Sequence, residues 1–230
     1  GDMGVEIPFE QIPAIQKEII EKGYMSGKQV ITATQMLESM ITNLRPTRAE
    51  ITDVANAIYD GTSAIMLSGE TAAGKHPVEA VKTMALIAET TEKDINYIAR
   101  LSKRPMQKGI DSTNAIAHAA VTTAHDLGAK AVITVTKSGS TAKNISKYRP
   151  TCMIIGCTPD DTVHRQMSLS WGVVPVKMDE KSSTDELFSA AIDAAKSHGL
   201  VEKDDIVVIT AGIPLGVAGK TNMLKVDTIK

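Results

Sequence analysis

An alternation of short buried strands with amphipathic helices is the feature that most constrains the fold of this 230-residue chain. The alternation is clearest after residue 113. The predicted helices there are 114–127, 141–148, 161–169 and 184–198, and the predicted strands are 131–136, 153–157, 173–176 and 205–210. Helices and strands in this order are typical of βαβ units with a parallel sheet.

A last strand is predicted at residues 223–226. The connection before it, residues 212–222, is too short for the crossover helix that a parallel neighbour requires. We therefore expect this strand to lie antiparallel at an edge of the sheet. The domain that it closes is predicted to span residues 98–230, which is long enough to fold independently.

The first 97 residues show the same alternation, but with only two complete strands, predicted at 30–33 and 63–68. A parallel sheet is normally buried on both faces, and a sheet this small cannot cover its own faces. We therefore predict that residues 1–97 form an incomplete sheet, which needs a partner sheet or further strands.

Four helices are predicted in this first part from apolar spacing and from start and stop signals. They are a helix that ends at Gly23, one that follows Thr34 directly, one that begins at a capping box of Thr47 and Glu50 and ends at Gly61, and one from Pro77 to about residue 97. Residues 69–74 are predicted to form a loop before the last of these helices.

Composition limits the class of protein. Hydrophobic residues make up 43% of the chain and charged residues 23%, which is typical of a globular domain with a sizeable core. The net charge of −2 argues against a general nucleic-acid binder, because such proteins carry a basic excess. No apolar run is long enough to span a bilayer, so we expect no membrane association. The chain begins at Gly1 with no methionine, in what resembles the middle of a fold, and we expect it to be a fragment.

The two cysteines are predicted to be reduced. Cys152 and Cys157 lie five residues apart in one apolar run. On a strand that separation is about 16 Å, at roughly 3.3 Å per residue, whereas a disulfide needs Cα atoms within about 7 Å. The two side chains should also point to opposite faces of the sheet. This pattern indicates two core thiols in a cytosolic protein.

Polar side chains follow both strands of the first part. Thr34 comes directly after the first strand, and Ser68 and Glu70 follow the second. Because the carboxyl ends of parallel strands meet at one edge, where ligands bind in α/β folds, these three residues could share a pocket. A hydroxyl and a carboxylate across a glycine could also hold a water chain for proton delivery. The alternative, that they only cap helices, is about as well supported by the local sequence.

Gly1 and Asp2 form a second candidate. A carboxylate after a glycine suits a hard divalent cation such as Mg²⁺, which takes one or two protein carboxylates together with phosphate oxygens. The local sequence alone favours the other interpretation, a solvated turn aspartate.

The third candidate directly follows a strand and opens a helix. It consists of Thr136, Lys137, Ser138, Gly139, Ser140 and Thr141. Four hydroxyls, backbone N–H groups and a helix N-terminus suit a phosphate group. The Gly-Lys-Ser/Thr ending of a Walker loop is absent. The alternative is a helix-capping cluster, but a cap does not require so many hydroxyls. The five histidines show no ligand spacing and are predicted to lie on the surface or on helix faces.

Several motifs together resemble the pyruvate kinase family. They are residues 1–8 (GDMGVEIP), 33–40 (ATQMLESM), 45–50 (RPTRAE), 66–72 (MLSGETA), 146–150 (SKYRP) and 219–222 (GKTN). They occur in the family's order and cover essentially the whole chain. The resemblance implies an α/β protein in which residues 1–97 are the last part of a (β/α)8 TIM barrel and residues 98–230 are the effector-binding C-terminal domain.

The resemblance also implies an activity, which is phosphoryl transfer from phosphoenolpyruvate to ADP, giving pyruvate and ATP in glycolysis. Asp2 would ligate Mg²⁺ (or Mn²⁺), and the backbone around Gly1 and Asp2 would bind the substrate carboxylate. Thr34 would line the substrate pocket, and Ser68 and Glu70 would belong to the proton relay. The K⁺ ligands and the other catalytic residues of the family precede Gly1, so we expect this chain alone to be inactive.

In the second domain, the resemblance makes residues 136–141 an allosteric phosphate loop for fructose 1,6-bisphosphate or for another phosphorylated effector. Residues 179–184 lack the tryptophan and arginine expected for a second phosphate, so the effector is left open. Family members are usually cytoplasmic homotetramers, and residues 45–50 are a candidate interface. The alternative is a non-catalytic module for effector binding or assembly.

Overall fold

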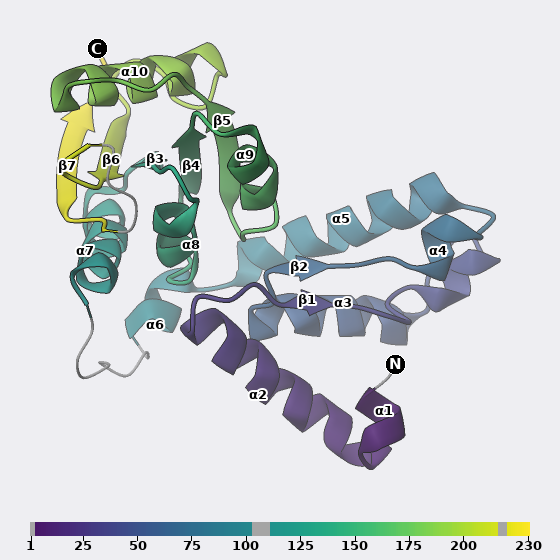
Figure 1. The fold of residues 1–230 in the computed structure, drawn as a ribbon. Helices are drawn as coiled ribbons and strands as arrows, with labels where there is room; N and C mark the ends of the chain where they lie inside the picture. The colour runs from purple at the N-terminus through teal and green to yellow at the C-terminus, as the bar shows by residue number, and fades with distance from the viewer. Residues whose placement is uncertain (1–2, 103–110, 216–219) are drawn as a thin grey trace. The chain divides into compact units, whose positions relative to one another are not determined.

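The computed structural model describes residues 3–102, 111–215 and 220–230. The chain divides into two compact units, Gly1–Ile95 and Asn96–Lys230 (Figure 1). Within the described ranges no helix is both long enough and apolar enough to cross a membrane.

The first unit is built on a pair of short strands. Its elements are α1 (Met3–Glu6), η1 (Phe9–Gln11), α2 (Ile12–Met25), β1 (Ile31–Thr32), η2 (Glu38–Ile41), α3 (Arg48–Asp60), β2 (Ala64–Ile65), α4 (Gly69–Ala72) and α5 (Pro77–Asp94). Strands β1 and β2 run parallel, with Ile31 opposite Ala64. This confirms the predicted parallel alternation and places the carboxyl ends of both strands at the same edge.

The core of this unit lies where α3 and α5 pack together with the segment after β1. Its buried side chains are Met36, Leu37, Met40, Val54, Ala57, Ile58, Ala80 and Met84. Helix α3 begins at the predicted capping box: Thr47 Oγ1 accepts from the backbone N–H of Glu50, and the Glu50 side chain accepts from the N–H of Thr47. The helix ends at Gly61, whose φ of 96° lies in the left-handed region that glycine allows without strain.

Three local predictions in this unit are wrong. The helix expected directly after Thr34 does not form, because Thr34 and Gln35 have φ values of 70° and 56°, and only the 3₁₀ turn η2 follows. Residues 69–74, expected as a loop, contain the short helix α4. Helix α2 passes through Gly23 and ends at Met25. The backbone of the segment after β1 is held by side chains from other elements, which apolar spacing alone does not reveal.

The second unit follows the predicted order closely. Its elements are α6 (Tyr97–Ser102), α7 (Ser112–Leu127), β3 (Ala131–Val135), α8 (Ser140–Ser146), β4 (Met153–Thr158), α9 (Asp161–Met167), β5 (Val173–Lys177), α10 (Thr184–Ser197), β6 (Ile206–Ala211) and β7 (Met223–Thr228). Only α6 was not predicted as a separate helix, because the long helix expected to reach about residue 97 ends at Asp94.

The five strands form one sheet in the order β5-β4-β3-β6-β7. Strand β3 is parallel to β4 and β6, whereas β7 is antiparallel to β6 and lies at the edge, as predicted (Figure 1). One face of the sheet packs against α10, and the other face packs against α7, α8 and Met167 of α9. The sheet is therefore covered on both faces, as a largely parallel sheet requires.

Both cysteines are free thiols, as predicted. Cys157 packs in the core under α10, and Cys152 packs against the core under α7 and α8, so the two lie on opposite faces. Burial raises the pKa of Cys152 to about 11 and that of Cys157 to about 12. Both thiols are therefore protonated at neutral pH and poor nucleophiles.

Candidate functional site

The strand order of the second unit fixes where a ligand is expected. From β3 the chain proceeds through β4 to β5 on one side, and it then crosses back by α10 to β6 on the other side of β3. In open α/β sheets, ligands bind outside the carboxyl ends of the strands at such a switch point. A pocket of about 270 Å³ lies there, lined by residues that follow β3 and by Ala211 and Gly212 at the end of β6.

The predicted phosphate loop forms one wall of this pocket. Thr136, Lys137, Ser138, Ser140 and Thr141 all line it. The hydroxyls of Ser138 and Ser140 lie 3.0 Å apart. Gly139 has a φ of 76°, and a Cβ built on it would lie 3.3 Å from Met167 and Val163 side-chain atoms, so the turn requires glycine.

Two of the four hydroxyls in the loop serve the fold more than the pocket. Thr136 and Thr141 are each 6% exposed. The Thr141 hydroxyl is hydrogen-bonded to that of Thr221 at 2.7 Å, and the Thr221 N–H donates to Thr113 Oγ1. These contacts tie the loop to the segment before β7 and to α7. The side chains left to meet a ligand are Lys137, Ser138 and Ser140.

The opposite wall comes from the segment between β5 and α10. It contributes Met178, Asp179, Glu180, Lys181 and Ser182, and α10 itself adds Leu187. Lys137 Nζ lies 2.7 Å from Glu180 Oε1, so the two walls are joined by an ion pair. The two side chains are 45% and 63% exposed, and exposed ion pairs of this kind contribute little to stability. The contact can therefore open to admit a ligand at small cost.

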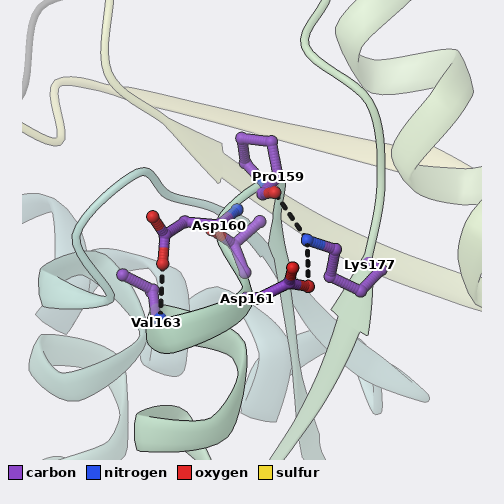
Figure 2. A network of polar contacts seen from close by, with 6 residues as sticks. Pro159, Asp160, Asp161, Val163 and Lys177 are labelled. Atoms are coloured by element: carbon purple, nitrogen blue, oxygen red, sulfur yellow. Dashed lines mark hydrogen bonds and ion pairs between the residues drawn. The ribbon is translucent and has the colours of Figure 1, made fainter.

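A polar network holds the third side of the pocket, at Pro159 (Figure 2). Lys177 Nζ, at the end of β5, donates to the Pro159 carbonyl at 2.6 Å and pairs with Asp161 Oδ1 at 2.7 Å. The hydrogen bond from Lys177 lowers the pKa of Asp161 below its ordinary value. Asp160 Oδ1 accepts from the Val163 N–H at 2.8 Å and caps α9. The network fixes the loop that joins β4 to α9.

Sequence reasoning identified the wall after β3, and it considered residues 179–184 only as the expected place of a second phosphate. The lining residues that it did not connect with the site include Pro159, Gly212 and Lys220. Their positions in the sequence could have identified these residues, because they follow other predicted strands of the same sheet and the carboxyl ends of parallel strands lie at one edge.

In the first unit, Glu70 links the two segments that were predicted to meet. Its side chain is only 2% exposed. One carboxylate oxygen accepts from the Leu37 N–H at 3.0 Å, and the other accepts from the Ser68 N–H at 2.8 Å. The segment after β1 is thereby attached to the segment after β2, at the edge where both strands end.

Thr34 lies apart from this buried contact. It is exposed and lines a pocket of about 580 Å³ together with residues of α2, β1 and α3. Ser68 and Glu70 do not line that pocket. The backbone after Thr34 is thus joined to Glu70, while the Thr34 side chain lines a pocket that Ser68 and Glu70 do not line.

The predicted metal ligand, Asp2, and its neighbour Gly1 lie outside the described residues. Among the residues that are described, no cluster of three or more histidine, cysteine or acidic side chains is placed to bind a metal ion. Both oxygens of the buried Glu70 accept backbone N–H groups, which leaves that carboxylate poorly suited to a hard cation.

Comparison with sequence families gives two matches that belong together. The family described as "Pyruvate kinase, barrel domain" matches residues 1–81, and "Pyruvate kinase, alpha/beta domain" matches residues 114–227. The two matches fall in the first and the second compact unit, respectively.

Individual proteins give the same result. A pyruvate kinase of Clostridium acetobutylicum is 53% identical over the whole chain, which covers 49% of that protein. A pyruvate kinase of Geobacillus stearothermophilus is 52% identical, and the chain covers 39% of it. A crystal structure of a pyruvate kinase from Cryptosporidium parvum superposes with a TM-score of 0.90 at 42% identity, over 99% of this chain and 45% of that one. The chain spans half or less of the length of these relatives.

Proposed function

The chain belongs to the pyruvate kinase family, and from this premise we propose that it supplies the C-terminal part of an enzyme that transfers a phosphoryl group from phosphoenolpyruvate to ADP. The products would be pyruvate and ATP, in the cytoplasm, as a step of glycolysis. The first unit would contribute part of the catalytic barrel, and the second would bind a phosphorylated effector.

The observation that carries the catalytic part of the proposal is the Glu70 bridge. Its two accepted hydrogen bonds hold the backbone at Leu37 and at Ser68 together, next to the carboxyl ends of β1 and β2. Preorganised groups at that edge are what a phosphoryl-transfer site requires, because positioning and electrostatics supply most of its catalysis.

Glu70, Ser68 and Thr34 would each have a role that follows from its position. Glu70 would position Ser68 and the segment after Thr34, and exclude water from the base of the site. The Ser68 hydroxyl would pass a proton toward the enolate carbon during pyruvate formation, and Thr34 would contact the substrate. Mg²⁺ (or Mn²⁺) and K⁺ would neutralise phosphoryl charge, and Asp2, which lies outside the described residues, would be a ligand of the divalent ion.

A chimera tests this proposal. The 230 residues would replace the matching segment of the Clostridium acetobutylicum relative, with which they align in full. We expect the chimera to form pyruvate in a coupled assay and the 230-residue chain alone to show no turnover, because it spans half or less of its relatives' length.

Substitutions in the chimera then separate the roles. Ser68→Ala is expected to lower kcat by roughly 10²-fold or more, the range for loss of a positioned proton-transfer group. Thr34→Val should raise KM or lower kcat. Thr52→Val is a matched control, because the Thr52 hydroxyl donates to the Arg48 carbonyl on the exposed surface of α3. Unchanged kinetics for both Ser68→Ala and Thr34→Val in an active chimera would refute the assignment.

The proposed enzyme would be a homotetramer, with residues 45–50 as a candidate interface. The second candidate function is a non-catalytic module for effector binding or assembly that binds a phosphorylated metabolite. The pocket between Lys137 and Glu180 favours it, because this pocket is complete within the second unit. A chimera that binds inorganic phosphate at this pocket but forms no pyruvate would favour the module.

A further inference from the structure

The loop that joins α8 to β4, residues 147–152, is attached to α7 by two histidines. The Tyr148 ring lies edge-on to the His118 ring, with the ring centroids 5.4 Å apart. The Thr151 N–H donates to His125 Nε2 at 3.0 Å. The two histidines are seven positions apart on α7, so they lie on one face of the helix. That face of α7 therefore holds both ends of the loop.

The hydrogen bond from Thr151 requires the neutral form of His125. A ring nitrogen of histidine accepts a hydrogen bond only when it carries no proton, and both ring nitrogens are donors in the charged form. A charged His125 would thus point an N–H at the Thr151 N–H, and the contact would become repulsive. Burial lowers the pKa of His125 below its ordinary value, and Asp126 on the same helix raises it by less. The folded chain therefore holds His125 neutral at pH 7.

The charged form also has a favourable place to go. His125 lies in the last turn of α7, where the helix dipole favours a positive charge. Asp126, the next residue, favours it as well. Protonation would therefore exchange the contact with the loop for interactions within α7.

Other charged and titratable side chains lie on α8, on the loop and directly before β3 and β6. They are Lys143, Lys147, Arg149, Cys152, Lys130, Asp204 and Asp205. Among the described residues, Asp126 is the charged group that changes the pKa of His125. Within the loop, Lys147 Nζ donates to the Asn114 side chain, and the Arg149 guanidinium carbon lies 5.0 Å from the Trp171 ring. The charge on His125 is thus set by burial and by one neighbour.

We propose that His125 is a pH-sensitive switch that attaches the loop between α8 and β4 to α7 while its imidazole is neutral. Uptake of one proton from solvent turns the acceptor into a donor and releases Thr151. The inference is independent of the proposed catalytic and phosphate sites, because it uses none of their residues.

The pH dependence of the switch has a definite sign. The pKa of His125 is lower in the folded chain than in the unfolded chain, so the unfolded chain binds more protons in mildly acid solution. The stabilisation by this contact is therefore present above the unfolded pKa, which is about 6.5. It is lost as the pH falls through the folded pKa.

Thermal denaturation of the 230-residue chain at pH 8 and pH 5, followed by tryptophan fluorescence, tests the inference. In His125→Gln the amide oxygen can still accept from the Thr151 N–H, but the side chain does not titrate. The unfolding temperature of the unmodified chain should fall by about 2–4 °C more than that of His125→Gln, the effect of losing one hydrogen bond. His125→Phe, which has no acceptor, should have a lower unfolding temperature than the unmodified chain already at pH 8.

The matched control is His198→Gln, which removes an exposed imidazole at the end of α10, on the other face of the sheet. It should keep the full fall of the unmodified chain. An equal fall in His125→Gln and His198→Gln would overturn the inference. A second measurement needs no variant: in NMR spectra of the unmodified chain, the Thr151 amide resonance should shift with the same midpoint as the His125 ring. A Thr151 amide that does not move while His125 titrates would also overturn it.

Discussion

At the scale of single residues, Glu70 shows how one buried carboxylate replaces a stretch of regular structure. The segment after β1 has the apolar spacing of a helix, yet Thr34 and Gln35 adopt left-handed backbone angles. The Glu70 carboxylate accepts the Leu37 N–H, a donor that would lie in the first turn of the expected helix and would need an acceptor outside that helix in any case. A backbone N–H can be satisfied by a side chain from elsewhere in the sequence as well as by a backbone carbonyl. Here the acceptor lies 33 positions away, so the conformation of the segment after β1 depends on a residue outside that segment.

We predict that Glu70→Gln destabilises the chain. The carboxylate accepts two backbone N–H groups, whereas the amide of glutamine can accept at only one end and presents a donor to the other N–H. The cost of leaving that buried N–H without an acceptor is about 1–3 kcal/mol. Urea denaturation of the 230-residue chain measures it. Glu89→Gln, at an exposed position of α5, is the control, and equal midpoints for the two variants would show that the bridge contributes nothing.

At the scale of elements, the sequence predicted the second unit far better than the first. Each helix and strand between residues 112 and 228 was expected, with ends within three residues, because each amphipathic helix packs on the sheet with the periodicity that its sequence shows. The antiparallel β7 followed from the length of one connection. In the first unit the strands are only two residues long, so local pattern carries less information there.

The candidate site was predicted only in part, for a related reason. The loop after β3 was visible because its hydroxyls are contiguous in the sequence. Residues 179–184 were considered only through the family resemblance, and the contact of Glu180 with Lys137 was not predicted, because it joins residues more than 40 positions apart. Sequence pattern identifies groups that lie together along the chain, whereas pairs across a pocket depend on the strand order of the sheet.

A prediction at this scale concerns the start of α3. Glu50 accepts from the Thr47 N–H at 2.7 Å, and it also accepts from the N–H and the hydroxyl of Ser39 at 2.7 and 2.6 Å. It therefore caps α3 and attaches η2 to it. Glu50→Ala should cost about 0.5–2 kcal/mol of stability, the range for loss of a helix cap. Thermal denaturation would measure the loss.

The pH dependence of this contribution has a definite sign. Burial tends to raise the pKa of Glu50, but hydrogen bonds from Ser39 and Thr47 outweigh it, and the pKa is held below its ordinary value. The unfolded chain then binds more protons at acid pH than the folded chain. The stabilisation is present above the unfolded pKa and is lost as the pH falls through the folded pKa. The difference between the unmodified chain and Glu50→Ala should therefore be largest near pH 7 and shrink below about pH 4. A difference that is constant from pH 7 to pH 3 would contradict this prediction.

At the scale of the whole molecule, the two compact units allow binding and folding to be observed separately. Trp171 is the single tryptophan of the chain and belongs to the second unit. Its ring lies 5.3 Å from that of Tyr97 and 5.0 Å from the Arg149 guanidinium carbon, and both partners belong to the same unit. Tryptophan fluorescence therefore reports on unfolding of the second unit, while far-UV circular dichroism reports on both.

Inorganic phosphate should raise the unfolding temperature seen by tryptophan fluorescence, because a ligand that binds only the folded state adds about 2.7 kcal/mol of stability at a hundred times its Kd. Phosphate also stabilises proteins in general by exclusion from their surfaces, and that effect should act on both units alike. Binding at the pocket instead acts on the second unit alone. The unfolding temperature measured by tryptophan fluorescence should then rise more than the unfolding temperature of the first unit, which is measured by circular dichroism. Lys137→Gln combined with Ser140→Ala should abolish the excess, since both side chains line the pocket. Equal shifts in the two signals, or an excess that survives this double substitution, would place the phosphate elsewhere.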